Sequence, residues 1–215
     1  MSRDTILKAV RAANSGRRAF EATPVSRLSS TTTDPASLTA AFVTRMTACG
    51  VIVEELPSPA DIPEAVLRYV TAARLPLTLR HGSDAMIAAL PWHKAPDLQR
   101  ETGAATPETQ AALSRALCGI AETGTLLLGS GAENPVTLAF LPDLHIVVLD
   151  SASIVETIDE GFCFAEAETG AVRLPRTVNL ISGASRTGDI GGRLVMGAHG
   201  PRQLVVLTVT KNGAA

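Results

Sequence analysis

Four unbroken apolar runs constrain the fold of this chain more than any other feature of its sequence. They are Thr125–Leu128, His145–Leu149, Val178–Ile181 and Leu204–Leu207. An unbroken run predicts a strand that is buried on both faces, as in a parallel sheet covered by helices. Aromatic residues make up only 3% of the chain, so Leu, Val, Ile and Ala must build the core. The runs therefore predict an α/β fold with a Rossmann-like, mostly parallel sheet covered by helices.

Helical patterns alternate with these runs. Apolar spacing predicts helices over residues 3–20, 38–49 and 62–70, with shorter strands at 51–53 and 77–79 and a short helix up to residue 90. Thr106 followed by Pro107 predicts the start of a helix that ends at Gly119. The capping box Ser153–Glu156 predicts another helix, which ends near Gly161.

The N-terminal part differs in composition from the rest. Residues 21–37 are rich in Thr, Ser and Pro, which is typical of a linker. We therefore divide the chain into an N-terminal helix with a mobile linker (residues 1–37) and an α/β domain (residues 38–215).

Composition excludes several classes of function. The net charge is −2 and the chain has no long basic block, whereas nucleic-acid binding usually requires a basic footprint. No apolar stretch approaches the ~20 residues that span a bilayer, and the N-terminus lacks the apolar core of a signal peptide. These features predict a cytoplasmic protein.

The cysteines do not predict a metal site. Cys49, Cys118 and Cys163 lie far apart and form no CxxC pair, so we interpret them as small buried hydrophobic residues. The sequence predicts no metal, zinc or iron–sulfur site in this chain alone, and no cofactor bound by it alone.

Three loops have compositions that suit a ligand site at strand ends: Ala121–Thr125, Ser182–Asp189 and Gly197–Arg202. The second, Ser182–Asp189, follows a predicted strand; its small residues allow a close backbone approach, and its amides, hydroxyls and Arg186 suit a carboxylate or phosphate. The alternative is a tight strand-to-helix turn, with Asp189 starting the helix. The predicted ligand-binding residues are Thr123, Gly124, Thr125, Ser182, Gly183, Ser185, Arg186, Thr187, Asp189 and Gly200.

Two residues in these loops are candidates for catalysis. Glu122 can act as an acid, a base or a nucleophile, or it can be a solvated or capping carboxylate. His199 lies in the third loop, Gly197–Arg202, where a turn role is favoured over that of a general base. The segment Gly129–Asn134 has only part of a dinucleotide fingerprint, and a surface turn is favoured.

The three loops resemble the lactate-utilisation protein C family, the LutC/YkgG type of LUD domain. The resemblance rests on Ala121–Thr125, Ser182–Ile190, Gly197–Pro201 and the pair Leu141-Pro142. The chain departs from the family pattern at Ala184 (usually proline), Gly188 (usually alanine) and Gly191 (usually acidic). The last difference removes a carboxylate from the site.

The resemblance implies a fold similar to the NagB/RpiA/CoA-transferase group. It also implies a role in oxidising L-lactate to pyruvate beside two iron–sulfur partner subunits. Such a reaction needs a redox acceptor, and the sequence of this chain predicts no binding site for one. The resemblance thus implies a non-redox subunit that binds a small anionic ligand, the iron–sulfur partners, or both.

Two other functions stay open. One is an independent transferase or ligase acting on a CoA-like or nucleotide-like ligand, with Glu122 as nucleophile or base; it rests on analogy with the fold group alone. The other is a non-catalytic scaffold module whose loops recognise a ligand or partner.

Overall fold

The computed structural model describes residues 2–14, 34–169, 174–190, 193–197 and 200–210. The helices are α1 (Arg3–Asn14), α2 (Pro35–Ala48), η1 (Pro59–Asp61), α3 (Ile62–Ala72), α4 (Ala85–Ala89), η2 (Trp92–Lys94), η3 (Val136–Ala139), η4 (Ser151–Ser153) and α5 (Ile158–Thr169). The strands are β1 (Ile52–Leu56), β2 (Thr78–His81), β3 (Gln99–Thr102), β4 (Ala111–Arg115), β5 (Cys118–Ile120), β6 (Thr125–Gly129), β7 (Leu144–Asp150), β8 (Ile154–Val155), β9 (Val178–Ile181), β10 (Arg186–Ile190), β11 (Arg193–Met196) and β12 (Gln203–Val209).

The main sheet has six strands in the order β1-β12-β7-β4-β2-β3, and every neighbouring pair is parallel. A second sheet has the order β8-β5-β6-β9, and β10 and β11 form a separate antiparallel hairpin. The prediction of an α/β fold with a mostly parallel sheet covered by helices is confirmed.

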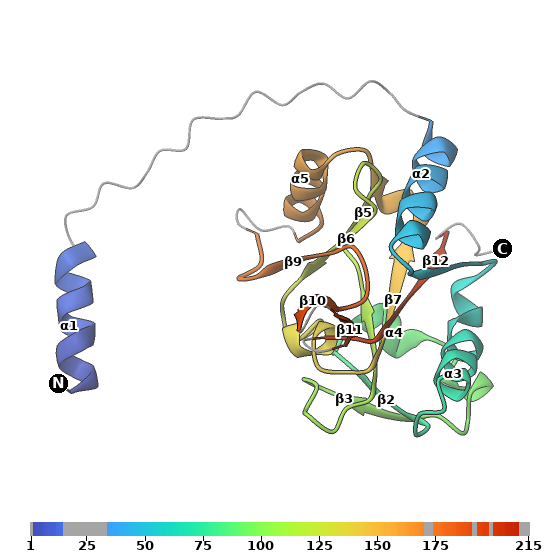
Figure 1. Cartoon of the computed structure of the whole chain (residues 1–215), viewed down its shortest axis with the longest axis horizontal. Coiled ribbons are helices and arrows are strands. Elements are labelled where there is room, and N and C mark those ends of the chain that lie inside the picture. The colour runs from blue at the N-terminus through green and yellow to red at the C-terminus, as the bar shows by residue number, and fades with distance from the viewer. Residues whose placement is uncertain (1, 15–33, 170–173, 191–192, 198–199, 211–215) are drawn as a thin grey trace.

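The two faces of the main sheet have different coverings. On one face, Leu113 and Ile146 join the core formed with α3, α4 and Trp92. On the other face, Val147 packs with Phe42 of α2 and with the second sheet. Because side chains alternate along a strand, each central strand contributes to both cores. In Figure 1 strands β5 and β6 of the second sheet lie between α5 and α2.

Two of the predicted helices are wrong. Residues 111–115 and 118–120 form β4 and β5 instead of a helix from Thr106 to Gly119. Thr106 makes a turn with Thr109, whose N–H donates to the Thr106 carbonyl at 3.0 Å. Tertiary packing overrides the helical pattern here, since β4 lies between β2 and β7 and is buried on both faces.

The other error places a capping box four residues too early. Ile154 and Val155 form β8, which pairs with β5, and α5 contains Gly161 instead of ending there. The capping box in the structure consists of Thr157 and Glu160. The Glu160 N–H donates to Thr157 Oγ1 at 3.2 Å, and the Glu160 carboxylate accepts from the Thr157 N–H at 3.4 Å.

Two apolar runs also differ from their predicted setting. β6 pairs antiparallel with β5 and β9 in the second sheet, not in the parallel sheet. β6 is nevertheless buried on both faces, because Leu126 and Leu128 pack on the main sheet while Leu127 packs toward α5. β9 is more exposed, with Leu180 46% exposed. Burial on both faces here reflects the stacking of layers, not strand direction.

Candidate functional site

The first and second loops meet through a chain of hydroxyl groups. The Oγ1 atoms of Thr123 and Thr125 lie 2.7 Å apart, and Thr125 Oγ1 lies 2.7 Å from Ser182 Oγ. The antiparallel register pairs Leu126 with Ile181, so the residues just outside that pair, Thr125 and Ser182, face each other. The β6–β9 pairing therefore places three hydroxyl side chains in one line.

The second and third loops meet through main-chain hydrogen bonds. The Ser185 N–H donates to the Pro201 carbonyl at 2.8 Å, and the Gly197 N–H donates to the Ser185 carbonyl at 2.9 Å. Gly200 lies close to the second loop, because a Cβ atom there would be 3.1 Å from the Cβ of Ser185, a tight contact. We name the described part of these three loops the loop cluster: residues 122–125, 182–186, 197 and 200–201.

Arg186 connects the loop cluster to the C-terminal end of α2. Its Nη2 donates to the carbonyl of Cys49 at 2.7 Å, where the last carbonyls of a helix lack partners and a cation is favourable. The guanidinium lies against Gly50, where an added Cβ would be 2.2 Å from Nη2 and where φ is +77°. Arg186 remains exposed, and Nη2 is the nitrogen that carries this bond.

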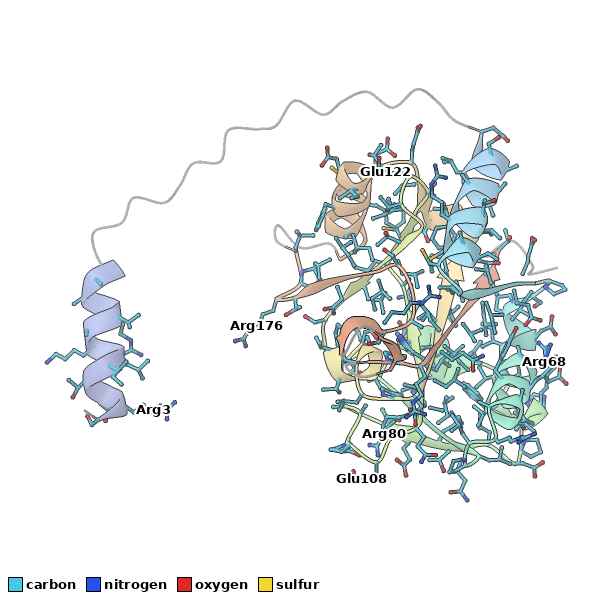
Figure 2. All side chains as sticks on the ribbon, viewed as in Figure 1. Arg3, Arg68, Arg80, Glu108, Glu122 and Arg176 are labelled. Atoms are coloured by element: carbon cyan, nitrogen blue, oxygen red, sulfur yellow. The ribbon has the colours of Figure 1, made fainter. Side chains whose placement is uncertain are left out.

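Glu122 caps a helix in the structure. Its Oε1 accepts from the Ile158 N–H, the first amide of α5, at 2.8 Å, and a carboxylate is favourable at a helix N-terminus. Glu122 is exposed, and Figure 2 shows it at the end of the molecule opposite Arg80 and Glu108. This geometry corresponds to the capping alternative that the sequence left open.

The loop cluster lies at the amino edge of the main sheet. Pro201 precedes β12, Gly50 precedes β1, and the Phe140 carbonyl, before β7, lies within 4.0 Å of the Cβ position of Gly200. The strands that end at the cluster, β5, β9 and β11, all lie outside the main sheet. The three predicted loops thus lie together, but at the edge opposite the carboxyl ends of the parallel strands.

The remaining predicted residues have different positions. Thr123, Gly124, Thr125, Ser182, Gly183, Ser185, Arg186 and Gly200 all lie in the loop cluster. Thr187 and Asp189 belong to β10, so Asp189 does not start a helix as the turn alternative supposed. His199 and Gly191 lie outside the described residues.

The cysteines are not all buried. Cys118 is buried and its Sγ donates to the Gly161 carbonyl at 3.7 Å; burial raises its pKa to about 12. Cys49 and Cys163 are half-buried. Within the described ranges no three His, Cys, Asp or Glu side chains converge as metal ligands.

An ion pair that the sequence patterns did not predict lies at the opposite, carboxyl edge of the main sheet. Asp84 follows β2, Arg115 ends β4, and Arg115 Nε donates to Asp84 Oδ2 at 2.8 Å. Assigning residues 106–118 to a helix hid this pair, because Arg115 was not placed at the end of a strand. Strand assignment alone would have placed Arg115 at a strand end, and the pairing of β2 with β4 brings it beside Asp84.

The main sheet is open and parallel. Helices cover one of its faces, and a helix with the second sheet covers the other. This layering defines an α/β protein of the Rossmann-like class. The chain belongs to the LUD domain family, whose model matches residues 39–209. The resemblance drawn from the three loops is therefore confirmed.

Several curated proteins are similar to this chain. An uncharacterised protein of Neisseria meningitidis serogroup B is 38% identical over 141 residues, which cover 63% of this chain and 59% of that protein. Lactate utilization protein C of Deinococcus radiodurans is 40% identical over 100 residues, 46% of each chain. YkgG of Escherichia coli is 33% identical over 93 residues, 42% of this chain and 40% of that protein. The chain thus matches about half the length of these relatives.

One solved structure has a similar fold. The crystal structure of a DUF162 family protein from Deinococcus radiodurans superposes with a TM-score of 0.59 at 22% identity, covering 82% of this chain and 99% of that chain. Within the described part of this chain, no helix is both long and apolar enough to cross a membrane.

Proposed function

We propose that this protein is a non-redox component of an L-lactate utilisation system and that its loop cluster binds a small anion. The family and the relatives named lactate utilization protein C support the pathway. Two observations carry the binding proposal: the hydroxyl chain Thr123–Thr125–Ser182, and the guanidinium of Arg186, which donates to the Cys49 carbonyl. That carbonyl oxygen lies 3.4 Å from the Cβ position of Gly183, the residue after Ser182. Hydroxyl donors and a guanidinium are the groups that bind carboxylates and phosphates.

The roles that we propose for this chain and for its partner subunits follow from the chemistry of the substrate. Oxidising L-lactate to pyruvate releases two electrons and two protons, and these need an acceptor. In this proposal partner subunits with iron–sulfur clusters take the electrons, and this chain holds an anionic substrate, product or cofactor group. The proposal gives Glu122 no part in the binding step, because its carboxylate would repel an anion and its Oε1 accepts from the Ile158 N–H.

Growth and binding measurements test the proposal together. Deleting the gene should abolish growth on L-lactate and leave growth on glucose unchanged. Calorimetric titration of the purified chain with L-lactate and pyruvate should show binding to the wild type. Thr125→Val, which keeps the side-chain shape and removes the hydroxyl, and Ser182→Ala should each weaken that binding by about tenfold, the loss of one hydrogen bond to a charged ligand.

Arg176→Ala is the matched control, because Arg176 is an exposed arginine outside the loop cluster (Figure 2). It should leave both growth and binding unchanged. Normal growth of the deletion strain on L-lactate would exclude a required role of the protein in L-lactate utilisation. Full complementation by Thr125→Val, Ser182→Ala and Arg186→Ala variants would instead support a scaffold role.

A further inference from the structure

The main sheet has a topological switch point between β2 and β4. These strands are neighbours, with Arg80 paired to Ala112. The chain leaves β2 through α4, whose Ile87 belongs to the core on one face. It leaves β4 through β5 and β6, whose Leu126 belongs to the core on the other face. Connections that depart on opposite faces open a crevice outside the carboxyl ends of the two strands, where open α/β sheets bind ligands.

A cation with unused donors lies at this point. Both carboxylate oxygens of Asp84 are occupied: Oδ1 accepts from the Ile87 N–H at 3.0 Å and Oδ2 accepts from Arg115 Nε at 2.8 Å. Asp84 is 6% exposed and fixes the guanidinium in place. Among the described residues the two terminal nitrogens of Arg115 have no hydrogen-bond partner, and its side chain is 35% exposed.

The loop Gly129–Asn134 lies beside Arg115 and is held in place by two hydrogen bonds. The Ser83 N–H donates to the Ala132 carbonyl at 3.1 Å, and Asn134 Nδ2 donates to the Gly129 carbonyl at 3.1 Å. The approach of this loop to β2 requires glycine at 82, where a Cβ would lie 1.9 Å from the Glu133 carbonyl oxygen. The segment interpreted from sequence as a surface turn is therefore packed against the carboxyl edge of the sheet.

The loop and the two strand ends line an open crevice with a volume of about 80 Å³. We name it the carboxyl-edge crevice; its polar lining consists of Asp84, Arg115, Ser130, Glu133 and Asn134. This space has room for a few waters or for one small organic anion.

We propose that the carboxyl-edge crevice binds a small monocarboxylate, which the terminal nitrogens of Arg115 hold as a bidentate pair. A guanidinium fork matches the planar carboxylate group. Arg115 contributes one positive charge to the lining, and Asp84 and Glu133 each contribute a negative one, so a ligand that pairs with the guanidinium is favoured to carry a single negative charge. A phosphate dianion would meet greater repulsion from Glu133 at the same distance.

This inference is independent of the proposed function. The crevice lies at the carboxyl edge of the main sheet and the loop cluster lies at the amino edge. A variant in the crevice therefore tests one site without altering the other. Either site can fail its test while the other passes.

Gly131→Leu tests the proposal without removing Arg115, whose loss would leave the buried Asp84 unpaired. Gly131 lines the crevice, and an added Cβ there would have a single neighbour within 4 Å, the Glu133 nitrogen at 3.9 Å. A leucine side chain at this lining position should obstruct the crevice and leave the fold intact. Ala132→Leu is the matched control, since it adds the same side chain at the next, exposed position, which does not line the crevice.

The measurement is a titration of the ¹⁵N-labelled full chain with acetate, propionate and inorganic phosphate, followed by NMR at the Arg115 Nε–H resonance. In the wild type we expect saturable chemical-shift changes with both carboxylates and about tenfold weaker binding of phosphate than of the carboxylates. Carboxylate binding should be at least tenfold weaker in Gly131→Leu and unchanged in Ala132→Leu. Glu133→Gln should tighten carboxylate binding. No saturable shift with either carboxylate, or equal binding in Gly131→Leu and wild type, would overturn the site; tighter binding of phosphate would overturn the ligand class.

Discussion

Acidification is predicted to destabilise this protein through His145, which is fully buried in β7. Burial lowers the pKa of His145 from 6.5 to about 3, because a charged imidazole would lose its hydration in the core. The ring is held in its neutral form beside Ser114 of β4, with Nε2 and Oγ 2.5 Å apart. In the described part of the structure Nδ1 is buried without a partner. No nearby group would therefore stabilise the positive charge that a second proton adds to the ring.

The size of the effect follows from proton linkage. Between its folded pKa of about 3 and its unfolded pKa of 6.5, the residue binds a proton only in the unfolded chain. The free energy of unfolding then falls by about 1.4 kcal/mol for each pH unit of acidification. The contribution of His145 is complete above pH 6.5 and is lost as the pH falls below it. From about pH 7.5 to pH 5 the loss is about 2 kcal/mol.

Urea unfolding at a series of pH values measures this loss directly. The double variant Ser114→Ala/His145→Leu removes the titrating ring together with the hydroxyl that it would leave unpaired. We expect its free energy of unfolding to decrease by about 2 kcal/mol less than that of the wild type over this pH range. His93→Gln, which removes an exposed histidine, is the control and should keep the wild-type slope.

Equal slopes in the wild type and the double variant would refute the reasoning. That result would mean that His145 titrates alike in the folded and unfolded chains, against its complete burial. The comparison uses differences in slope, so a loss of stability common to all pH values in the double variant does not affect it.

Three further perturbations have expected results from the same structure. Glu122→Ala should lower the free energy of unfolding by about 1 kcal/mol, because it removes the cap on the Ile158 N–H, and Glu122→Gln should lose less, since its amide carbonyl still accepts; equal losses in urea unfolding would contradict the cap. Leu113→Ala in the centre of β4, at 0% exposure, should cost about 3 kcal/mol by the same measurement, and a loss below about 1 kcal/mol would contradict its burial. Gly124→Ala should lower the melting temperature, since φ is +61° and the added Cβ would lie 2.6 Å from Arg45 Cβ; an unchanged melting temperature would contradict this backbone geometry.

The sequence predicted the long apolar strands and the helices α1 to α4, but not β3, β4, β5, β8, β10 and β11. All four apolar runs form strands, because a run of Leu, Val and Ile has few ways to be buried other than between two layers. The segment 106–118 fails because a spacing of Leu113, Ala116 and Leu117 fits a helix as well as two short strands. Only the pairing of β4 with β2 and β7 decides between them.

The candidate site was predicted in part. The segments of the loop cluster were selected correctly as neighbours, and the contacts of Thr125 with Ser182 and of Ser185 with Pro201 join them. The partners of the charged residues were not foreseen. Arg186 reaches a carbonyl 137 residues away in the chain, at Cys49, and no local pattern encodes a contact of that separation.

By itself, the sequence determined the apolar strands, the α/β class and the loops that mark the family, because each depends on residues close together in the chain. The tertiary structure alone decided that β6 and β9 run antiparallel, that the loop cluster lies at the amino edge, and that Asp84 and Arg115 meet at the carboxyl edge. The physical reason is that strand order and layer stacking are set by burying the whole apolar surface at once. That arrangement determines which distant polar groups come within hydrogen-bonding distance.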